Sequence, residues 1–212
     1  FSTMMETFGK YQVEFVSTTE KFDTSSPMGR AMLNICIVFA QLERETIQKR
    51  VADAYFSRSQ KSFYMGGRVP YGYCLVPAVI GGVKTSMYEI VPEEAEVVRL
   101  MYELYSKPEC SYGDLIRTFQ EHGITQNGKP WVRTRMADIL RSPIYVRADL
   151  SVYQFYQNQG AIIANDPSDF IGTNGCYYYK GKEGSGRKQM NLEGNHLVLA
   201  PHEGIVPADT WL

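Results

Sequence analysis

The spacing of apolar side chains predicts one helix that is far longer than any other element of the chain. Ser25 or Ser26 can cap its start, and Pro27 suits its first turn. From Met28 to about Ser62 there is no proline and only one glycine, which gives roughly 50 Å of helix at 1.5 Å per residue. A single compact domain rarely needs so long a helix, so we expect it to connect two parts of the protein.

The first half of this helix has two apolar faces. One face repeats in steps of four and three residues, as a coiled-coil seam does, and a second face lies beside it. A helix that is apolar on two sides has two surfaces to bury, one against its own domain and one against a partner subunit. The seam consists of Met28, Met32, Ile35, Phe39 and Leu42, and the second face of Leu33, Ile37 and Ala40.

Shorter elements are predicted on both sides of the long helix. Residues 1–10 have helical spacing, and Gln12–Thr18 alternates as a strand does. A helix that leads into a strand is typical of the end of an α/β domain. After a glycine-containing linker, Tyr71–Val76 and Met87–Val91 are predicted to form strands around a Gly-Gly turn.

Three short helices are predicted next. Pro92 opens the first, and Ser111 with Asp114 forms a capping box for the second. A tight Asn-Gly turn precedes the third, which spans about Arg133–Arg141, and the arrangement is typical of a helix-turn-helix. Further strands are expected at the segments Tyr153–Tyr156, Tyr177–Tyr179 and His196–Leu199.

These elements predict a helix-rich α+β fold. It comprises the remnant of an α/β domain, one very long helix, and a mixed α/β domain with a core like a helix-turn-helix. The expected boundaries are 1–27 for the remnant, 28–62 for the helix, 63–70 for a linker and 71–212 for the second domain.

The distribution of charged residues along the chain limits the classes of function that we consider. The net charge is only −1, yet basic residues outnumber acids in the segments 28–73, 129–147 and 180–188. Such segregation can place basic faces on a protein that is neutral in total, which favours a nucleic-acid partner. No stretch is apolar enough for a membrane span. The four cysteines form no CxxC pair, so we expect reduced thiols in an intracellular protein rather than a zinc site.

The longest motifs resemble a known family. Phe22-Asp23-Thr24, Pro27, Gly29, then Phe39-Ala40-Gln41-Leu42-Glu43-Arg44 and Arg50 resemble the end of the catalytic domain and the long helix of serine site-specific recombinases. The block Gly67-Arg68-Val69-Pro70-Tyr71-Gly72-Tyr73, the segment from Glu94-Ala95 to Pro143-Ile144-Tyr145, and His196–Trp211 resemble the following domain of the large branch, the serine integrases and transposon recombinases.

The resemblance implies site-specific DNA strand exchange through a phosphoserine intermediate, in a cytoplasmic protein. It implies no metal or nucleotide cofactor, because the covalent link stores the bond energy. Double-stranded DNA is the expected partner, with a homo-oligomer that is a dimer and, on DNA, a tetramer in the full-length protein. The family's nucleophilic serine precedes the segment matched here, so we expect this chain to bind DNA and not to cut it. A helix-turn-helix transcription regulator with a dimerising helix is one alternative. A scaffold protein that binds no DNA and assembles through its long helix is another, which the three basic segments disfavour.

Two arginines of the long helix are candidate supports for catalysis. Positions 43, 47 and 50 share one face of a helix, so Glu43 and Arg50 can approach the same region. The resemblance implies that arginines bear the charge of the phosphate under attack, for which guanidinium forks are suited. We therefore assign supporting roles to Arg44 and Arg50.

Candidate DNA contacts fall in two groups. The first surrounds the end of the long helix and the linker, where Gly66 and Gly67 permit close approach to a narrow groove. The second surrounds the third short helix, whose N-terminal residues are expected nearest the bases of a major groove. The residues are Arg58, Lys61 and Arg68 in the first group, and Lys129, Arg133, Arg135 and Arg141 in the second.

Aromatic residues near these groups have two interpretations. Trp131 and Trp211 are predicted to be core residues rather than platforms for bases. Tyr177–Tyr179 suits either a core strand or a DNA-touching hairpin with the basic residues that follow it, namely Lys180, Lys182, Arg187 and Lys188.

Overall fold

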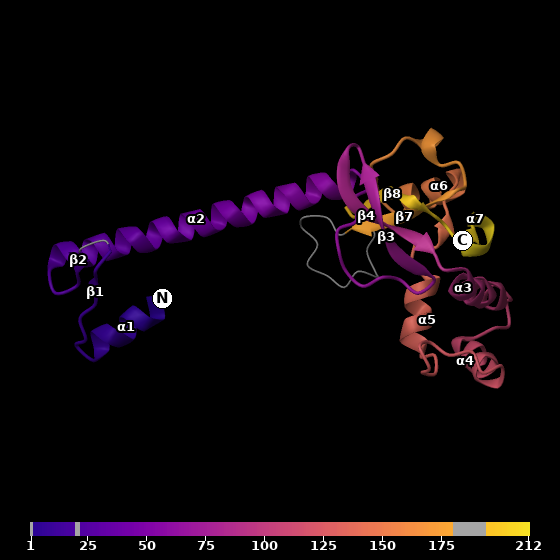
Figure 1. Cartoon of the computed structure of the whole chain (residues 1–212), viewed down its shortest axis with the longest axis horizontal. Coiled ribbons are helices and arrows are strands. Elements are labelled where there is room, and N and C mark those ends of the chain that lie inside the picture. The colour runs from indigo at the N-terminus through magenta and orange to yellow at the C-terminus, as the bar shows by residue number, and fades with distance from the viewer. Residues whose placement is uncertain (1, 20–21, 180–193) are drawn as a thin grey trace. The chain divides into compact units, whose positions relative to one another are not determined.

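The computed structural model describes residues 2–19, 22–179 and 194–212 (Figure 1). They group into two compact units, Phe1–Tyr55 and Phe56–Leu212. Both units contain part of helix α2 (Pro27–Gln60), which is 34 residues long. The predicted long helix is therefore confirmed.

The first unit begins with helix α1 (Ser2–Lys10), followed by strands β1 (Val16–Ser17) and β2 (Phe22–Asp23), which pair antiparallel. The predicted strand at 12–18 is thus only two residues long. Of the two possible caps of the long helix, Ser26 takes the role, because its hydroxyl accepts a hydrogen bond from the Gly29 N–H at 3.0 Å.

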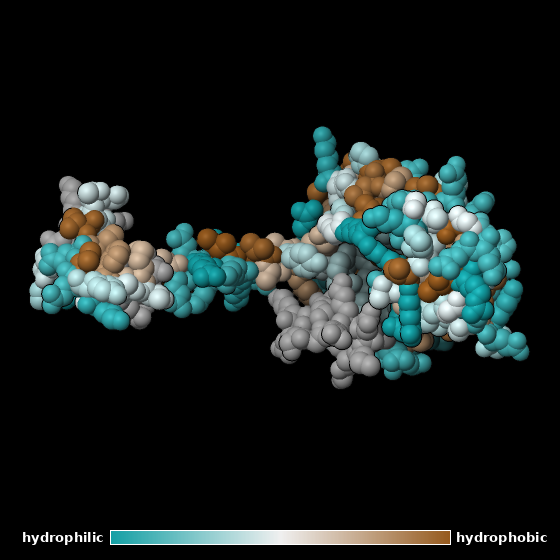
Figure 2. Space-filling model, turned by 90° about the horizontal axis from the view of Figure 1, so that it is seen from below, coloured by the Kyte–Doolittle hydropathy of each residue, from teal (hydrophilic) through white to brown (hydrophobic). Residues whose placement is uncertain are grey.

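The two apolar faces of α2 differ in exposure. On the second face Leu33 is only 7% exposed, whereas every residue of the predicted seam is at least two-fifths exposed, up to 73% for Met28. Figure 2 shows hydrophobic residues at the surface of this helix. On the second face Leu33 is thus buried and Ile37 half-buried, whereas Ala40 and all residues of the seam are exposed.

The second unit opens with a hairpin and three helices. Strands β3 and β4 pair antiparallel around Gly81-Gly82, whose φ angles of 56° and 78° suit a two-residue hairpin turn. Helices α3, α4 and α5 contact one another pairwise, which agrees with the predicted core. The bounds are β3 Tyr73–Ile80, β4 Val83–Ile90, α3 Pro92–Tyr105, α4 Tyr112–Glu121 and α5 Arg133–Leu140.

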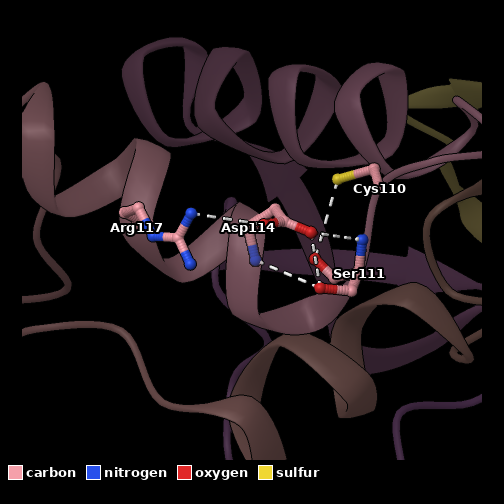
Figure 3. Close-up of polar contacts among 4 residues, drawn as sticks. All are labelled: Cys110, Ser111, Asp114 and Arg117. Carbon is pink, nitrogen blue, oxygen red and sulfur yellow. Dashed lines mark hydrogen bonds and ion pairs between the residues drawn. The ribbon is translucent and has the colours of Figure 1, made fainter.

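The predicted capping box starts α4 (Figure 3). The Ser111 hydroxyl accepts a hydrogen bond from the Asp114 N–H at 3.3 Å, and the Asp114 carboxylate accepts one from the Ser111 N–H at 3.1 Å. Hydrogen bonds from the hydroxyl and the backbone N–H of Ser111 lower the pKa of Asp114. Arg117 lies 3.5 Å from the same carboxylate, and the Cys110 thiol approaches the Ser111 carbonyl at 3.7 Å.

The last third of the chain combines small sheets with helices. Strand β8 is the centre of a three-stranded sheet, parallel to β6 and antiparallel to β7, and β5 pairs with β9 in parallel. The bounds are β5 Val146–Arg147, α6 Leu150–Asn158, β6 Ile162–Ile163, η1 Pro167–Asp169, β7 Asn174–Tyr179, β8 His196–Glu203, β9 Val206–Pro207 and α7 Ala208–Trp211.

The prediction of a strand at Tyr153–Tyr156 is wrong, because this segment lies in helix α6. The Asp149 carboxylate caps the helix by accepting hydrogen bonds from the N–H groups of Ser151 and Val152 at 2.9 and 3.3 Å. Val152 and Tyr156 are four residues apart and both buried, which is helical spacing. The aromatic residues therefore follow a helical period that the adjacent rings obscured.

Buried side chains form two clusters in the second unit. The larger joins α3, α4 and α5 to the hairpin and includes Trp131 at 2% exposure. The smaller surrounds α6 and β8, and Trp211 packs against both clusters while its Nε1–H donates to the Ser142 carbonyl at 3.2 Å. The core roles predicted for both tryptophans are confirmed.

Candidate nucleic-acid interface

Helix α5 is held by its buried face. Met136, Ile139 and Leu140 lie in the larger cluster, and the Tyr102 hydroxyl donates a hydrogen bond to the Ile139 carbonyl at 2.7 Å. The helix begins at Arg133 with no side-chain cap. Its position is thus fixed by the core, while its polar side chains are left for other contacts.

A cavity of about 400 Å³ lies beside α5. It brings together segments that are far apart in the sequence, because Arg68, Asn127 and Arg135 all border it. The remaining lining residues are Val69, Pro70, Tyr71, Tyr73, Glu94, Gln126, Asp138, Ile139, Ser142 and Tyr145.

Arg68 is carried by residues 66–73, which we term the arm. Gly66 and Gly67 have φ angles of 86° and 111°, a region that side chains disfavour. The Tyr64 hydroxyl donates to the Gly67 carbonyl at 2.8 Å. The arm therefore follows a defined course past Arg68 to the edge of the hairpin.

The predicted Asn-Gly turn forms the next side of the cavity. Gln126 and Lys129 exchange backbone hydrogen bonds of 2.8 and 3.0 Å, and Asn127 and Gly128 both have positive φ. This two-residue turn places Asn127 at the cavity, and the Lys129 side chain is exposed. The DNA contact predicted for Lys129 stays a prediction. Asn127 is added to the candidate site because it lines the cavity.

The cavity has mixed charge. Glu94 and Asp138 border it together with the two arginines. Burial raises the pKa of Tyr71, and the Glu94 carboxylate adds to the increase. Burial also raises the pKa of Tyr145, so both hydroxyls remain neutral donors at physiological pH. The lining of the cavity therefore combines guanidinium, amide, hydroxyl and carboxylate groups.

The other arginines of the second group lie away from this cavity. Arg133 stacks on the Tyr112 ring at 5.3 Å, and Tyr112 in turn contacts the Tyr105 ring at 4.8 Å. A hydrogen bond with Tyr112 raises the pKa of Tyr105, and the charge of Arg141 opposes the increase. Arg133 and Arg135 are thus divided between two sides of α5.

The first group is also divided. Arg58 is exposed and lies over the Phe63 ring at 5.3 Å, and Lys61 follows it at the end of α2. The next residue, Ser62, donates from its hydroxyl to the Leu199 carbonyl at 2.5 Å. Arg58 and Lys61 therefore lie at the point where the end of α2 meets β8, and they do not line the cavity that Arg68 borders.

The two arginines assigned to catalysis lie in the first unit. Arg44 borders a groove of about 710 Å³ with Phe15, Leu33 and other residues of α2. Arg50 borders a separate groove of about 620 Å³, which Glu43 shares as the spacing predicted. The structure places Arg44 and Arg50 in different grooves.

The burial of Tyr177–Tyr179 in β7 favours the interpretation of this segment as a core strand. Tyr177 is 4% exposed in the larger cluster, Tyr178 packs against the smaller one, and the Tyr179 hydroxyl donates to the Phe63 carbonyl at 3.3 Å. The basic residues proposed to accompany it lie outside the described residues, namely Lys180, Lys182, Arg187 and Lys188.

Sequence reasoning gave no site role to several polar residues that line the cavity, among them Glu94, Asn127 and Tyr145. Glu94 and Tyr145 entered only as ends of a family motif, and Asn127 only as part of a turn. The motif Tyr71-Gly72-Tyr73 was a usable signal, because a glycine between two aromatic residues often marks a close approach of backbone to another element.

Comparison with known proteins identifies the family. Residues 92–212, more than half of the chain, match a family model described as "Recombinase". The chain belongs to the recombinase family. Residues 1–61 also match the model "Resolvase, N terminal domain". These two matches confirm the resemblance to large serine recombinases on either side of the linker.

We also compared this recombinase-family chain with curated proteins and with solved structures. No curated protein matches it. A solved structure entitled "Crystal Structure of a LSR-DNA Complex" is 15% identical, with a TM-score of 0.41. The match covers 76% of this chain and 35% of that one, so the chain spans about a third of the length of that relative. No helix among the described residues is long and apolar enough to cross a membrane.

Proposed function

We propose that this chain is the DNA-binding and oligomerisation portion of a serine recombinase, which exchanges DNA strands at specific sites through a phosphoserine intermediate. The observation that carries the proposal is the cavity at which Arg68 of the arm and Arg135 of α5 meet. Guanidinium groups suit both phosphate and guanine, and the chain belongs to the recombinase family. No observation favours the transcription-regulator alternative.

In this proposal the two groups of basic residues contact different features of one duplex. Helix α5 enters the major groove, and the arm follows the backbone into the neighbouring minor groove. Arg58 and Lys61 contact phosphates before the arm, while Lys129 and Arg141 contact phosphates beside α5. The domain boundaries predicted from the sequence, with a linker at 63–70, belong to this proposal.

The first unit would serve catalysis and assembly. Arg44 and Arg50 would support the phosphate that the family's nucleophilic serine attacks. The exposed seam of α2 would pair with a second copy, as a dimer and as a tetramer on DNA in the full-length protein. Because its proposed substrate is intracellular DNA, we also propose a cytoplasmic location.

The direct test is binding of a generic fluorescent DNA duplex to the 212-residue chain at several salt concentrations. We expect binding at low salt that weakens as salt rises, with a log–log slope of about 0.9 per phosphate contact. A matched control is Lys84→Ala, which removes a positive charge from the β4 strand away from the cavity. Absence of binding at low salt would contradict the proposal.

A further inference from the structure

Hydrogen bonds connect the arm to the rest of the second unit, and the DNA-binding proposal gives them no role so far. The Tyr145 hydroxyl donates to the Tyr71 carbonyl at 2.9 Å. The Glu94 carboxylate accepts a hydrogen bond from the Gly72 N–H at 2.7 Å. Gly72 in turn accepts a hydrogen bond from the Val91 N–H at 3.0 Å. Both Glu94 and Tyr145 also line the cavity that Arg68 and Arg135 border.

The geometry of Gly72 explains why this connection is specific. Its φ is 93°, and a Cβ atom there would lie 3.2 Å from Ile205 and 3.3 Å from Val98. The Gly72 backbone therefore packs closely against Val98 of α3 and against Ile205, and a side chain at this position would crowd both. Its N–H points away from the strand pairing, and the Glu94 carboxylate is its partner.

The negative charge of Glu94 is unexpected at a site proposed to bind DNA. A carboxylate beside two arginines that face DNA repels phosphate, so its charge alone would weaken binding. The neighbouring Glu93 is exposed, lies in the same first turn and does not line the cavity. A favourable contribution of Glu94 to DNA binding would therefore act through its hydrogen bond to the arm.

We propose that Glu94, assisted by the Tyr145 hydroxyl, is a positioning residue that fixes the arm so that Arg68 remains at the cavity with Arg135. The inference rests on the proposed function of DNA binding. A hydrogen bond to a charged acceptor is among the stronger ones in proteins, and it holds the backbone only four residues after Arg68. The fixed arm sets the separation of the two arginines before DNA arrives, which reduces the ordering cost of binding.

The test compares DNA affinity of the 212-residue chain and its variants on the same generic duplex, with thermal unfolding as a folding check. Relative to the control Glu93→Ala, we expect Glu94→Ala to bind about tenfold more weakly. Glu94→Gln should bind at least as tightly as the wild type, because its amide oxygen still accepts from Gly72 and the repulsive charge is gone. Equal affinities of Glu94→Ala and Glu93→Ala would overturn the inference.

A double-mutant cycle separates positioning from general destabilisation. If Glu94 acts through the arm, Glu94→Ala should change affinity by less than about twofold in an Arg68→Ala background. A full additive loss there would show that Glu94 acts independently of Arg68 and would overturn the inference. If Glu94→Ala fails to fold, Tyr145→Phe takes its place, because it keeps the ring and removes only the hydroxyl. The same double-mutant cycle of Tyr145→Phe with Arg68→Ala then tests the inference. Failure of the wild type to bind the duplex would instead overturn the proposed function.

Discussion

At the scale of single residues, the arginines of α5 lie on different sides of the helix. Arg135 borders the cavity with Arg68, whereas Arg133 is stacked on Tyr112. Residues two positions apart on a helix point to different sides, so adjacent arginines cannot share one contact. The structure thus separates two candidates that the sequence grouped at the N-terminal end of one recognition helix.

Arg135 lines the cavity and Arg141 does not, which predicts that the two arginines affect base preference differently. Arg135→Ala should relax the preference at one or two base pairs and cost roughly 1–3 kcal/mol for the preferred sequence. Arg141→Ala should weaken all sequences about equally, because its expected contact is with phosphate. The measurement is selection from randomised duplexes with each variant. Unchanged preference for both Arg133→Ala and Arg135→Ala would move recognition away from α5.

A buried histidine makes the stability of the second unit depend on pH. His202 is 1% exposed, with its Nε2 3.0 Å from the Ile144 carbonyl and its Nδ1 without a partner among the described residues. Burial lowers the pKa of His202 to about 4. The unfolded chain takes up this proton near pH 6.5 and the folded chain only near pH 4, so stability is lost as pH falls between these values.

We expect the free energy of unfolding to fall by about 2 kcal/mol between pH 7 and pH 5 through this one group. In urea titrations at the two pH values, His202→Gln should reduce the difference by that amount, since its amide can still donate to Ile144. His122→Gln, at the exposed end of α4, is the matched control for the loss of an imidazole that is not buried. An identical difference in wild type and His202→Gln would refute the assignment.

At the scale of elements, helices joined to the core carry the basic side chains at defined places. The end of α2 is fixed to β8 by the Ser62–Leu199 hydrogen bond and by the rings of Phe56 and His196, whose centres are 4.8 Å apart. Arg58 is steadied on Phe63 just before this junction. The helix end can therefore present two positive charges on a rigid support.

This support predicts a purely electrostatic contribution to DNA binding. Replacing Arg58 and Lys61 together with alanine should weaken binding to all sequences and reduce the log–log salt slope by about 0.9 for each lost contact. The same titration on a variant with Arg99→Ala and Lys107→Ala, which removes two charges outside the cavity, provides the control. If the Arg58 and Lys61 variant keeps both affinity and slope, the end of α2 does not contact the backbone of DNA.

At the scale of the whole molecule, the uncovered seam of α2 is a large exposed apolar surface. Phe39 and Leu42 are 64% and 56% exposed, and neither forms part of the buried clusters. Contiguous apolar surface of this kind marks an interaction site in soluble proteins. The 4-3 spacing favours another helix as the partner, and a second copy of α2 offers the same spacing.

We therefore expect the wild-type chain to sediment at a higher mass than the variant Phe39→Asp with Leu42→Asp at equal concentration. Two aspartates in the seam would have to be buried as charges, which opposes association. Asn34→Asp with Gln48→Asp adds the same charge to exposed positions of α2 on the side away from the seam and should sediment like the wild type. An associated wild type with a seam variant of the same mass would refute the seam as the interface.

Sequence alone determined the features that depend on neighbouring residues. The box of Ser111 with Asp114 and the Asn127-Gly128 turn follow from local hydrogen bonds and backbone preferences, and both appear where they are expected. For the cap of α2 the sequence offers Ser25 or Ser26, and the structure selects Ser26. Family motifs also pointed to the recombinase match. Tertiary structure decided the rest. Segment Leu150–Asn158 is a helix with Asp149 as its cap and two buried residues on one face, and Arg68 and Arg135 line one cavity. Contacts of this kind between distant segments depend on the shape of the core rather than on local spacing.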